Sequence, residues 1–364
     1  MRIAVFFGGE SVEHEISIIS ASQVIRALSL GYNVIPVYIS KDNKMYCCKG
    51  LDNLKTYTNL SKIIKKKNEI TVCREGKQYY LKRNFKKFAF DYAFPVVHGK
   101  GMEDGTLLAY LKFLKIPVIG DNLSFYSVAQ NKVLTKRILD SLNIKNSRYE
   151  EFSDIRELNE IMYPVVVKPN CLGSSIGVKK ANNYDELSEN LRIAFMYDRR
   201  VIVEEFIEDA LEYNISVLEK NGEIIVSDIE EVIKDSDVLD YKQKYEKGKK
   251  SEGMASASRV FPAKIDEELK KKMEAIAKVI YKRFNAKGVI RIDFLYSDEL
   301  YVNEINAIPG SYSYYLWKNK MDFVELLDCV IDTAKRDNFK DNKLIKSIEK
   351  MTIFDNYKGS KLKG

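Results

Sequence analysis

The chain has 364 residues, 45% of them hydrophobic and 30% charged, a balance that is typical of globular proteins and excludes disordered and fibrous ones. The formal net charge of +7 does not indicate a nucleic-acid partner, because the lysines gather in solvated runs such as 65–67 without interleaved aromatic residues. No apolar run approaches the roughly 20 residues that span a bilayer, so we expect a cytoplasmic protein that does not enter a membrane.

The first third of the chain predicts an α/β domain. An apolar strand at 3–7 leads through Gly8 and Gly9 into a helix with 3.6-residue periodicity over 16–28. Two further strands are expected at 33–38 and 90–97, with an irregular insertion at 41–80 between them. A helix is expected at 106–114. The length of the chain leaves room for roughly two more domains of ordinary size.

After about residue 121 the pattern changes to a smaller α+β unit, and after 207 to long alternating strands. The smaller unit is expected to hold one helix and three strands, at 130–142, 163–168, 177–180 and 201–206. The last unit is expected to hold one strand pair at 213–218 and 223–226 and another at 289–296 and 299–303, with a long helix at 266–284 between the two pairs. We place the domains at 1–121, 122–208 and 209–335, followed by a basic, partly disordered tail at 336–364.

Two adjacent strands near the end of the last domain carry oxygen ligands. Asp293 follows Arg291 by two residues, and Glu304 precedes Asn306 by two. Residues two apart share a face of a strand, so Asp293, Glu304 and Asn306 can project to one side of a hairpin. Such a set suits Mg²⁺ bound alongside substrate phosphates, although a solvated polar strand face gives the same pattern.

A second pattern places a lysine and then a glycine- and serine-bearing turn after an apolar strand. Lys168 ends the strand, and Gly173, Ser174, Ser175 and Gly177 follow. Such a turn can present a cation, backbone N–H groups and hydroxyls to a triphosphate. The lysine precedes the glycines, so this is not the usual phosphate loop, and an ordinary β-turn is the alternative.

Two glycine-bearing segments hold the only histidines. Glu13 and His14 follow the Gly8-Gly9 turn, where a helix start favours an anion and the acidic residue could hold an amine. The alternatives are a dinucleotide site, which lacks its glycine spacing, and acidic residues that merely stabilise the helix start. His98 begins a segment, 98–105, with more glycine than packing alone requires.

These four segments, in this order and at these separations, resemble the D-alanine:D-alanine ligase family of the ATP-grasp superfamily over residues 2 to about 335. The resemblance implies a three-domain ATP-grasp fold with an N-terminal Rossmann-like α/β domain. It implies two D-amino acids as substrates, ATP as co-substrate with two Mg²⁺ or Mn²⁺ ions, and a role in peptidoglycan precursor synthesis. A homodimer is also expected from the resemblance.

The same resemblance assigns roles to individual residues. Those expected around the first amino acid are Glu13, His98, Ser174 and Tyr245. Those expected to hold ATP are Lys132, Lys168, Ser175, Glu204, Glu205, Phe206, Ile207, Glu212 and Lys244. Asp293, Glu304 and Asn306 would carry the metal ions, and Arg291 with the backbone N–H of Gly310 would form the oxyanion site.

The second amino acid is where the chain departs from the family pattern. Ser311, Tyr315 and Leu316 are expected to contact it, but the stretch 312–317 is more aromatic than usual and replaces a serine near position 315. Within the family, the alternatives are D-serine or another small D-amino acid as second substrate, and a specialised dipeptide ligase. D-lactate fits less well because of Tyr245. From a different class, the alternative is a catalytically silent ATP-binding regulatory protein.

Overall fold

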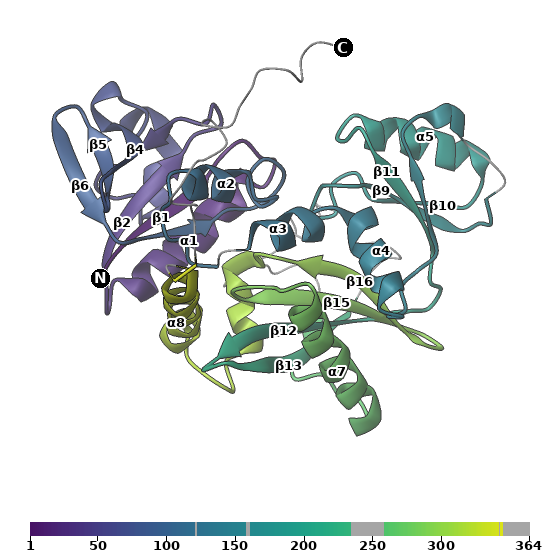
Figure 1. Cartoon of the computed structure of the whole chain (residues 1–364). Helices are drawn as coiled ribbons and strands as arrows, with labels where there is room; N and C mark the ends of the chain where they lie inside the picture. Colours follow the sequence, from purple (N-terminus) through teal and green to yellow (C-terminus); the bar gives the residue numbers. More distant parts are fainter. Residues whose placement is uncertain (121, 158–160, 234–257, 342, 345–364) are drawn as a thin grey trace, which may run out of the picture.

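The computed structural model describes residues 1–120, 122–157, 161–233, 258–341 and 343–344. Among these residues there are three sheets, of seven, four and five strands. Figure 1 shows them as successive units along the chain, with helices packed against each. The mixed α/β architecture is the one predicted. No helix within the described residues is long and apolar enough to cross a membrane.

The first sheet is built around β1 (Arg2–Gly8), which lies parallel to β2 (Asn33–Ile39) on one side and to β7 (Tyr92–Val96) on the other. β1 is completely buried from Ile3 to Phe7, as expected for a central parallel strand. The other elements of this first unit are β3 (Met45–Tyr46), η1 (Leu54–Lys62), η2 (Lys66–Asn68), β4 (Glu69–Glu75), β5 (Gln78–Arg83), β6 (Lys86–Phe90), α1 (His14–Leu28) and α2 (Thr106–Phe113). Because β1 and β7 are parallel, the glycine turns that follow them lie at one edge of the sheet.

The second unit has its own core beneath an antiparallel sheet in the order β10-β9-β11-β8. Its elements are α3 (Leu123–Ala129), α4 (Lys132–Ser141), β8 (Tyr149–Phe152), η3 (Ile155–Glu157), β9 (Val165–Pro169), β10 (Lys179–Ala181), α5 (Tyr184–Phe195) and β11 (Val201–Glu205). The predicted helix over about 130–142 corresponds to α4, and α3 is a further helix that the sequence did not predict. Asn131 is the N-cap of α4, because its side chain accepts a hydrogen bond from the Leu134 N–H at 2.9 Å.

The third unit is an antiparallel sheet in the order β14-β13-β12-β15-β16. Its elements are β12 (Leu211–Lys220), β13 (Glu223–Ile233), β14 (Ser258–Val260), α7 (Glu267–Arg283), β15 (Ile290–Tyr296), β16 (Leu300–Asn306), η4 (Gly310–Leu316) and α8 (Phe323–Asp341). α8 runs past residue 335, where the tail was predicted to begin. Within this stretch Arg336 contacts β12, with Nη2 at 2.7 Å from Glu219 Oε1.

Candidate active site

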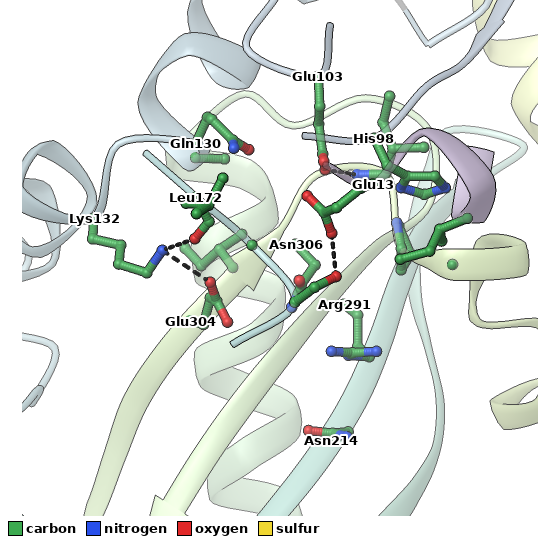
Figure 2. A pocket seen from close by; sticks show the side chains of 18 of the residues that line it. Glu13, His98, Glu103, Gln130, Lys132, Leu172, Asn214, Arg291, Glu304 and Asn306 are labelled. Carbon is green, nitrogen blue, oxygen red and sulfur yellow. Dashed lines mark hydrogen bonds and ion pairs between the residues drawn. The ribbon is translucent and has the colours of Figure 1, made fainter. Parts of the chain in front are cut away.

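One pocket is lined by helices, strands and loops from all three units. Its lining residues are Glu13, Ile16, His98, Glu103, Ala129, Gln130, Lys132, Leu172, Gly173, Ser174, Glu212, Asn214, Val232, Arg259, Arg291, Glu304, Ile305, Asn306, Ile308, Pro309 and Gly310. Figure 2 shows Glu13, His98 and Glu103 close together at one end of it. The four sequence segments singled out above therefore converge on a single pocket.

The turns after β1, β7 and β9 meet at Glu13. The Ser174 hydroxyl donates to a carboxylate oxygen of Glu13, which is 7% exposed. Glycine is required at this junction, since a Cβ on Gly99 would lie 2.1 Å from Ser11 Oγ and 2.8 Å from Glu13 Oε2, and the φ of Gly99 is +81°. The glycines thus let three backbone segments approach one carboxylate.

Burial disfavours the charged forms of both His98 and Glu103 beside Glu13. His98 is buried, with Nε2 at 3.2 Å from Ser20 Oγ, and burial lowers its pKa to about 4. Glu103 accepts backbone N–H bonds from Gly99 at 3.1 Å and Ile308 at 3.0 Å. Desolvation, and then the charge of Glu13, raise the pKa of Glu103 to about 8. This end of the pocket therefore has acidic oxygens that a ligand ammonium would stabilise.

Two lysines of the second unit point toward the third: Lys132 on α4 and Lys168 on β9. Lys132 Nζ is 2.5 Å from the Leu172 carbonyl oxygen and 3.4 Å from Glu304 Oε1. Lys168 Nζ is 2.9 Å from Glu204 Oε2 and 3.2 Å from Asn303 Oδ1. These contacts place both lysines between the second and third sheets, facing the hairpin of β15 and β16.

Glu204 is the buried anion at the centre of this cluster. Its Oε2 also lies 3.6 Å from Lys136 Nζ and accepts from the Ser147 hydroxyl at 3.1 Å. Burial opposes its ionisation, but Lys136 and Lys168 outweigh that effect and lower its pKa to about 2. Oε1 of Glu204 is buried without a hydrogen-bond partner among the described residues.

The segment after Glu204 turns away from the first pocket. Glu205 forms a two-point pair with Arg148, at 2.9 and 3.0 Å, because neighbouring strand residues face opposite sides. Together with Phe206 and Ile207 it lines a separate recess. Of the other predicted ATP residues, Lys132 and Glu212 line the first pocket, and Ser175 lies in the left-handed turn beside Ser174.

The hairpin of β15 and β16 brings the predicted metal ligands together. Asp293 is paired with Glu304, and Arg291 with Asn306, so all four share one face. Arg291 binds Asp293 at 2.6 Å (Nε to Oδ1) and 2.8 Å (Nη2 to Oδ2). Asn306 Nδ2 donates to Asp293 Oδ2 at 3.1 Å. A register shift at Asn303 turns its side chain toward Lys168.

The oxygen atoms of this face fit a hard cation. Mg²⁺ is commonly bound through one or two carboxylates together with substrate phosphates, and Asp293 and Glu304 supply two. No group of three or more His, Cys, Asp or Glu side chains in the described part of the chain could hold a metal by itself. The amide oxygen of Asn306 and a phosphate would have to complete the coordination.

Comparison with known proteins identifies the family. Residues 2–121 match the family described as D-ala D-ala ligase N-terminus, and residues 136–332 match D-ala D-ala ligase C-terminus. The chain is 38% identical over 355 residues to a D-alanine--D-alanine ligase of Thermosipho melanesiensis, covering 95% of this chain and 96% of the relative. The chain belongs to the D-alanine:D-alanine ligase family. The predicted family and the predicted class of ATP-dependent ligase are thereby confirmed.

Solved structures agree with this membership. The D-alanine-D-alanine ligase from Coxiella burnetii superposes with a TM-score of 0.80 at 25% identity, covering 94% of this chain and 96% of that one. The D-Ala:D-Ser ligase VanG from Enterococcus faecalis gives a TM-score of 0.76 at 29% identity, covering 92% and 99%. The predicted ATP-grasp fold is confirmed by these likenesses.

The segment expected to contact the second amino acid packs mainly between units. Gly310 lines the pocket, whereas Ser311, Tyr315 and Leu316 are not among its described lining residues. Leu316 is completely buried, and the Ser311 N–H donates to Ser20 Oγ at 3.0 Å. The Tyr312 hydroxyl bonds the Pro95 carbonyl at 3.2 Å. Much of the aromatic character of this stretch therefore serves packing, and contact of these residues with substrate remains a prediction.

Sequence patterns missed several pocket residues. Glu103, Asn214 and Arg259 line the pocket, and Glu230 lies behind the latter two. Glu103 was visible as a charge within the glycine-bearing segment 98–105, whereas the others occupy ordinary strand positions. The predicted residues Lys244 and Tyr245 lie outside the described residues.

Proposed function

We propose that this ligase joins two D-alanine molecules into D-alanyl-D-alanine for peptidoglycan precursor synthesis, converting ATP to ADP and phosphate. The observation that carries the proposal is the pocket that unites Glu13 and Ser174 with Lys132 and Arg291. It offers acidic oxygens for an ammonium group at one end, and cations for phosphate and carboxylate oxygens further along. Family membership supports the same reaction.

The proposed site of the first amino acid is the end of the pocket at Glu13. Its ammonium group would bind the Glu13 carboxylate, which the Ser174 hydroxyl orients. Neutral His98 adds no positive charge that would repel the ammonium. Ammonium binding would also favour ionisation of Glu103, because an adjacent cation lowers the pKa of a carboxyl group. This arrangement leaves the substrate carboxylate facing the lysines.

ATP is proposed to lie between the second and third sheets. Lys132 and Lys168 would hold its phosphates, and Glu212 its ribose. Glu204, with the backbone of 205–207, would meet the adenine, whose amino group would satisfy the buried Oε1 of Glu204. Ser175 in the turn and Lys244 in the segment outside the described residues are proposed to assist at the phosphates.

In the first step a carboxylate oxygen of D-alanine forms a bond to the γ-phosphorus, and the bond from that phosphorus to the bridging oxygen of ADP breaks. Lys132 and Lys168 offset the negative charge on the oxygens of the transferred group. Two Mg²⁺ or Mn²⁺ ions, held by Asp293, Glu304 and Asn306, would supply further charge neutralisation at the phosphates. The products are an acyl phosphate and ADP.

In the second step the free amine of the second D-alanine forms a bond to the acyl carbon. Phosphate departs with the electron pair of its C–O bond, and the nitrogen releases one proton. Arg291 and the Gly310 N–H are proposed to stabilise the tetrahedral oxyanion, since both border the pocket. Tyr245, outside the described residues, is proposed to help exclude water that would hydrolyse the acyl phosphate.

D-Serine is a second candidate for the amine substrate. The likeness to the D-Ala:D-Ser ligase from Enterococcus faecalis and the substitution at Tyr315 both favour testing it. The decisive assay measures phosphate release with ATP and Mg²⁺, first with D-alanine alone and then with D-alanine plus D-serine or D-lactate, and identifies the products by mass. Release of phosphate with D-alanyl-D-alanine as main product is expected. No release with D-alanine in any pairing would refute the proposal.

Two further parts of the proposal follow from the family. Its use of ATP and of small D-amino acids agrees with a cytoplasmic location. A homodimer is proposed from the resemblance, and sedimentation equilibrium should give twice the 42.0 kDa mass of the chain. A monomer at micromolar concentration would contradict that expectation.

A further inference from the structure

The ion pair of Glu230 and Arg259 lies on the same sheet face as the predicted metal ligands of the β15–β16 hairpin, called here the metal hairpin. Asn214 on β12 is paired with Asp293 on β15 and with Glu230 on β13, so these side chains point to one side. On the next strand Arg259 is paired with Val232, two residues beyond Glu230. The polar floor of the pocket therefore continues from the metal hairpin to Glu230 and Arg259.

Glu230 is completely buried and fixes the position of Arg259. Its two carboxylate oxygens accept from Arg259 Nη1 at 3.2 and 3.0 Å. Oε1 also accepts from Asn214 Nδ2 at 2.7 Å and from the Tyr315 hydroxyl at 2.6 Å. Asn214 and Tyr315 are neutral donors, so Arg259 balances the buried negative charge. Its guanidinium also lies 5.2 Å from the centre of the Tyr315 ring.

Arg259 extends from this buried anchor into the pocket. Its side chain is 28% exposed whereas that of Glu230 is 0% exposed, and Arg259 lines the pocket together with Arg291 and Asn214. Figure 2 shows Arg291 and Asn214 in the part of the pocket away from Glu103. Both contacts with Glu230 use Nη1, and a guanidinium presents five N–H donors in a rigid plane. The remaining edge of that plane suits a carboxylate.

Asn214 supplies an independent sign of a ligand at this place. Its Oδ1 is buried and has no hydrogen-bond partner among the described residues, although the side chain lines the pocket. A buried acceptor of this kind costs free energy unless a donor satisfies it. An N–H group of a bound amino acid would do so, next to the Glu230 carboxylate that both Asn214 and Arg259 contact.

The chemistry of the second step requires a cation here. The second amino acid attacks as a free amine, and in that form its carboxylate gives it a negative charge. Three described cations line the pocket, and all are paired with carboxylates. Lys132 pairs through its single nitrogen and Arg291 through both Nε and Nη2, whereas Arg259 contacts Glu230 through Nη1 alone. We propose that Arg259 binds the carboxylate of the second amino acid, with Glu230 as its positioning residue; this inference rests on the ligase activity proposed above.

The test compares amine acceptors with and without a carboxylate. Hydroxylamine and D-alaninamide can attack the acyl phosphate but offer no carboxylate to Arg259, whereas D-alanine does. In Arg259→Ala, the KM for the second D-alanine should rise roughly 10- to 100-fold, the range expected for losing a hydrogen bond between charged groups. The KM for the first D-alanine should change far less, and the preference for D-alanine over D-alaninamide should fall by the same factor.

Matched variants separate binding from folding. The control is Arg137→Ala, because Arg137 also pairs with a glutamate, Glu151, at 2.9 Å, but its side chain is 59% exposed. This variant should leave both KM values unchanged. Glu230→Gln keeps the shape of the anchor and should raise the second KM by a smaller factor than Arg259→Ala, with the acceptor preference shifted in the same direction.

The outcomes distinguish this inference from the proposed function. If the unchanged enzyme forms neither dipeptide nor D-alanyl hydroxamate, the ligase proposal itself fails. If the enzyme is active but Arg259→Ala keeps the preference for D-alanine over D-alaninamide, the carboxylate-binding role is refuted. Equal changes in the KM values of both amino acids would also overturn it, because they would indicate general damage to the pocket.

Discussion

Glu204→Gln should destabilise the protein strongly, since it leaves two buried lysines without their shared anion. Lys168 lies 2.9 Å and Lys136 3.6 Å from Glu204, with side-chain exposures of 13% and 3%. Removing one member of a buried ion pair costs about 3–5 kcal/mol. The depression of the Glu204 pKa from 4.5 to about 2 corresponds to about 3 kcal/mol at neutral pH, which agrees with that range.

The stabilising contribution of Glu204 decreases as the pH falls. Because the pKa of Glu204 is lower in the folded state, its contribution is fully present above pH 4.5 and is lost as the pH falls toward 2. Urea denaturation should therefore show a constant difference of about 3 kcal/mol between the two proteins from pH 8 to about 5.5, shrinking in more acidic buffers.

The neighbouring residue provides the matched control. Glu205 pairs with Arg148 at the surface, where the two side chains are 36% and 69% exposed. Glu205→Gln should cost less than about 1 kcal/mol, because solvent screens exposed ion pairs. Equal losses for Glu204→Gln and Glu205→Gln, or a Glu204 effect that persists unchanged to pH 3, would refute the reasoning.

Two other predictions concern the pocket. Asp293→Ala should abolish turnover even at saturating Mg²⁺, whereas Asp298→Ala, in the exposed turn of the same hairpin, should retain it; normal phosphate release by Asp293→Ala would disprove the metal assignment. The Glu103 pKa is raised to about 8, so its contribution to stability is present below pH 4.5 and declines as the pH rises through 8. Glu103→Gln should remove this decline in thermal denaturation between pH 6 and 9, and identical pH profiles for the two proteins would contradict it.

Local sequence patterns were sufficient to predict that the polar residues of the β15–β16 hairpin share one face. The two-residue spacing in Arg291, Asp293, Glu304 and Asn306 predicted a shared face, and the strand register places them on one. The reason is that side-chain direction alternates strictly along a strand, so sequence alone fixes it once the strand is recognised. The buried strand β1 and the glycine turn after it were predictable on the same grounds.

Other features depended on contacts between distant parts of the chain. Tyr315 reaches Glu230 across 85 residues, and no local pattern distinguishes that glutamate from others on a solvated strand.

The sequence by itself therefore determined the family, the α/β opening and the shared face of the β15–β16 hairpin, because these rest on short-range periodicity and on motifs in a fixed order. Only the tertiary structure decided which charges are buried, which residues partner them and which aromatic side chains pack away from the pocket. Glu204 and Glu230 are paired with cations from neighbouring strands of their own sheets, whereas Glu103 is also held by a backbone N–H from another unit. Burial and ion pairing arise only in the packed chain, and they set the charge of each titratable side chain and the direction in which it is held.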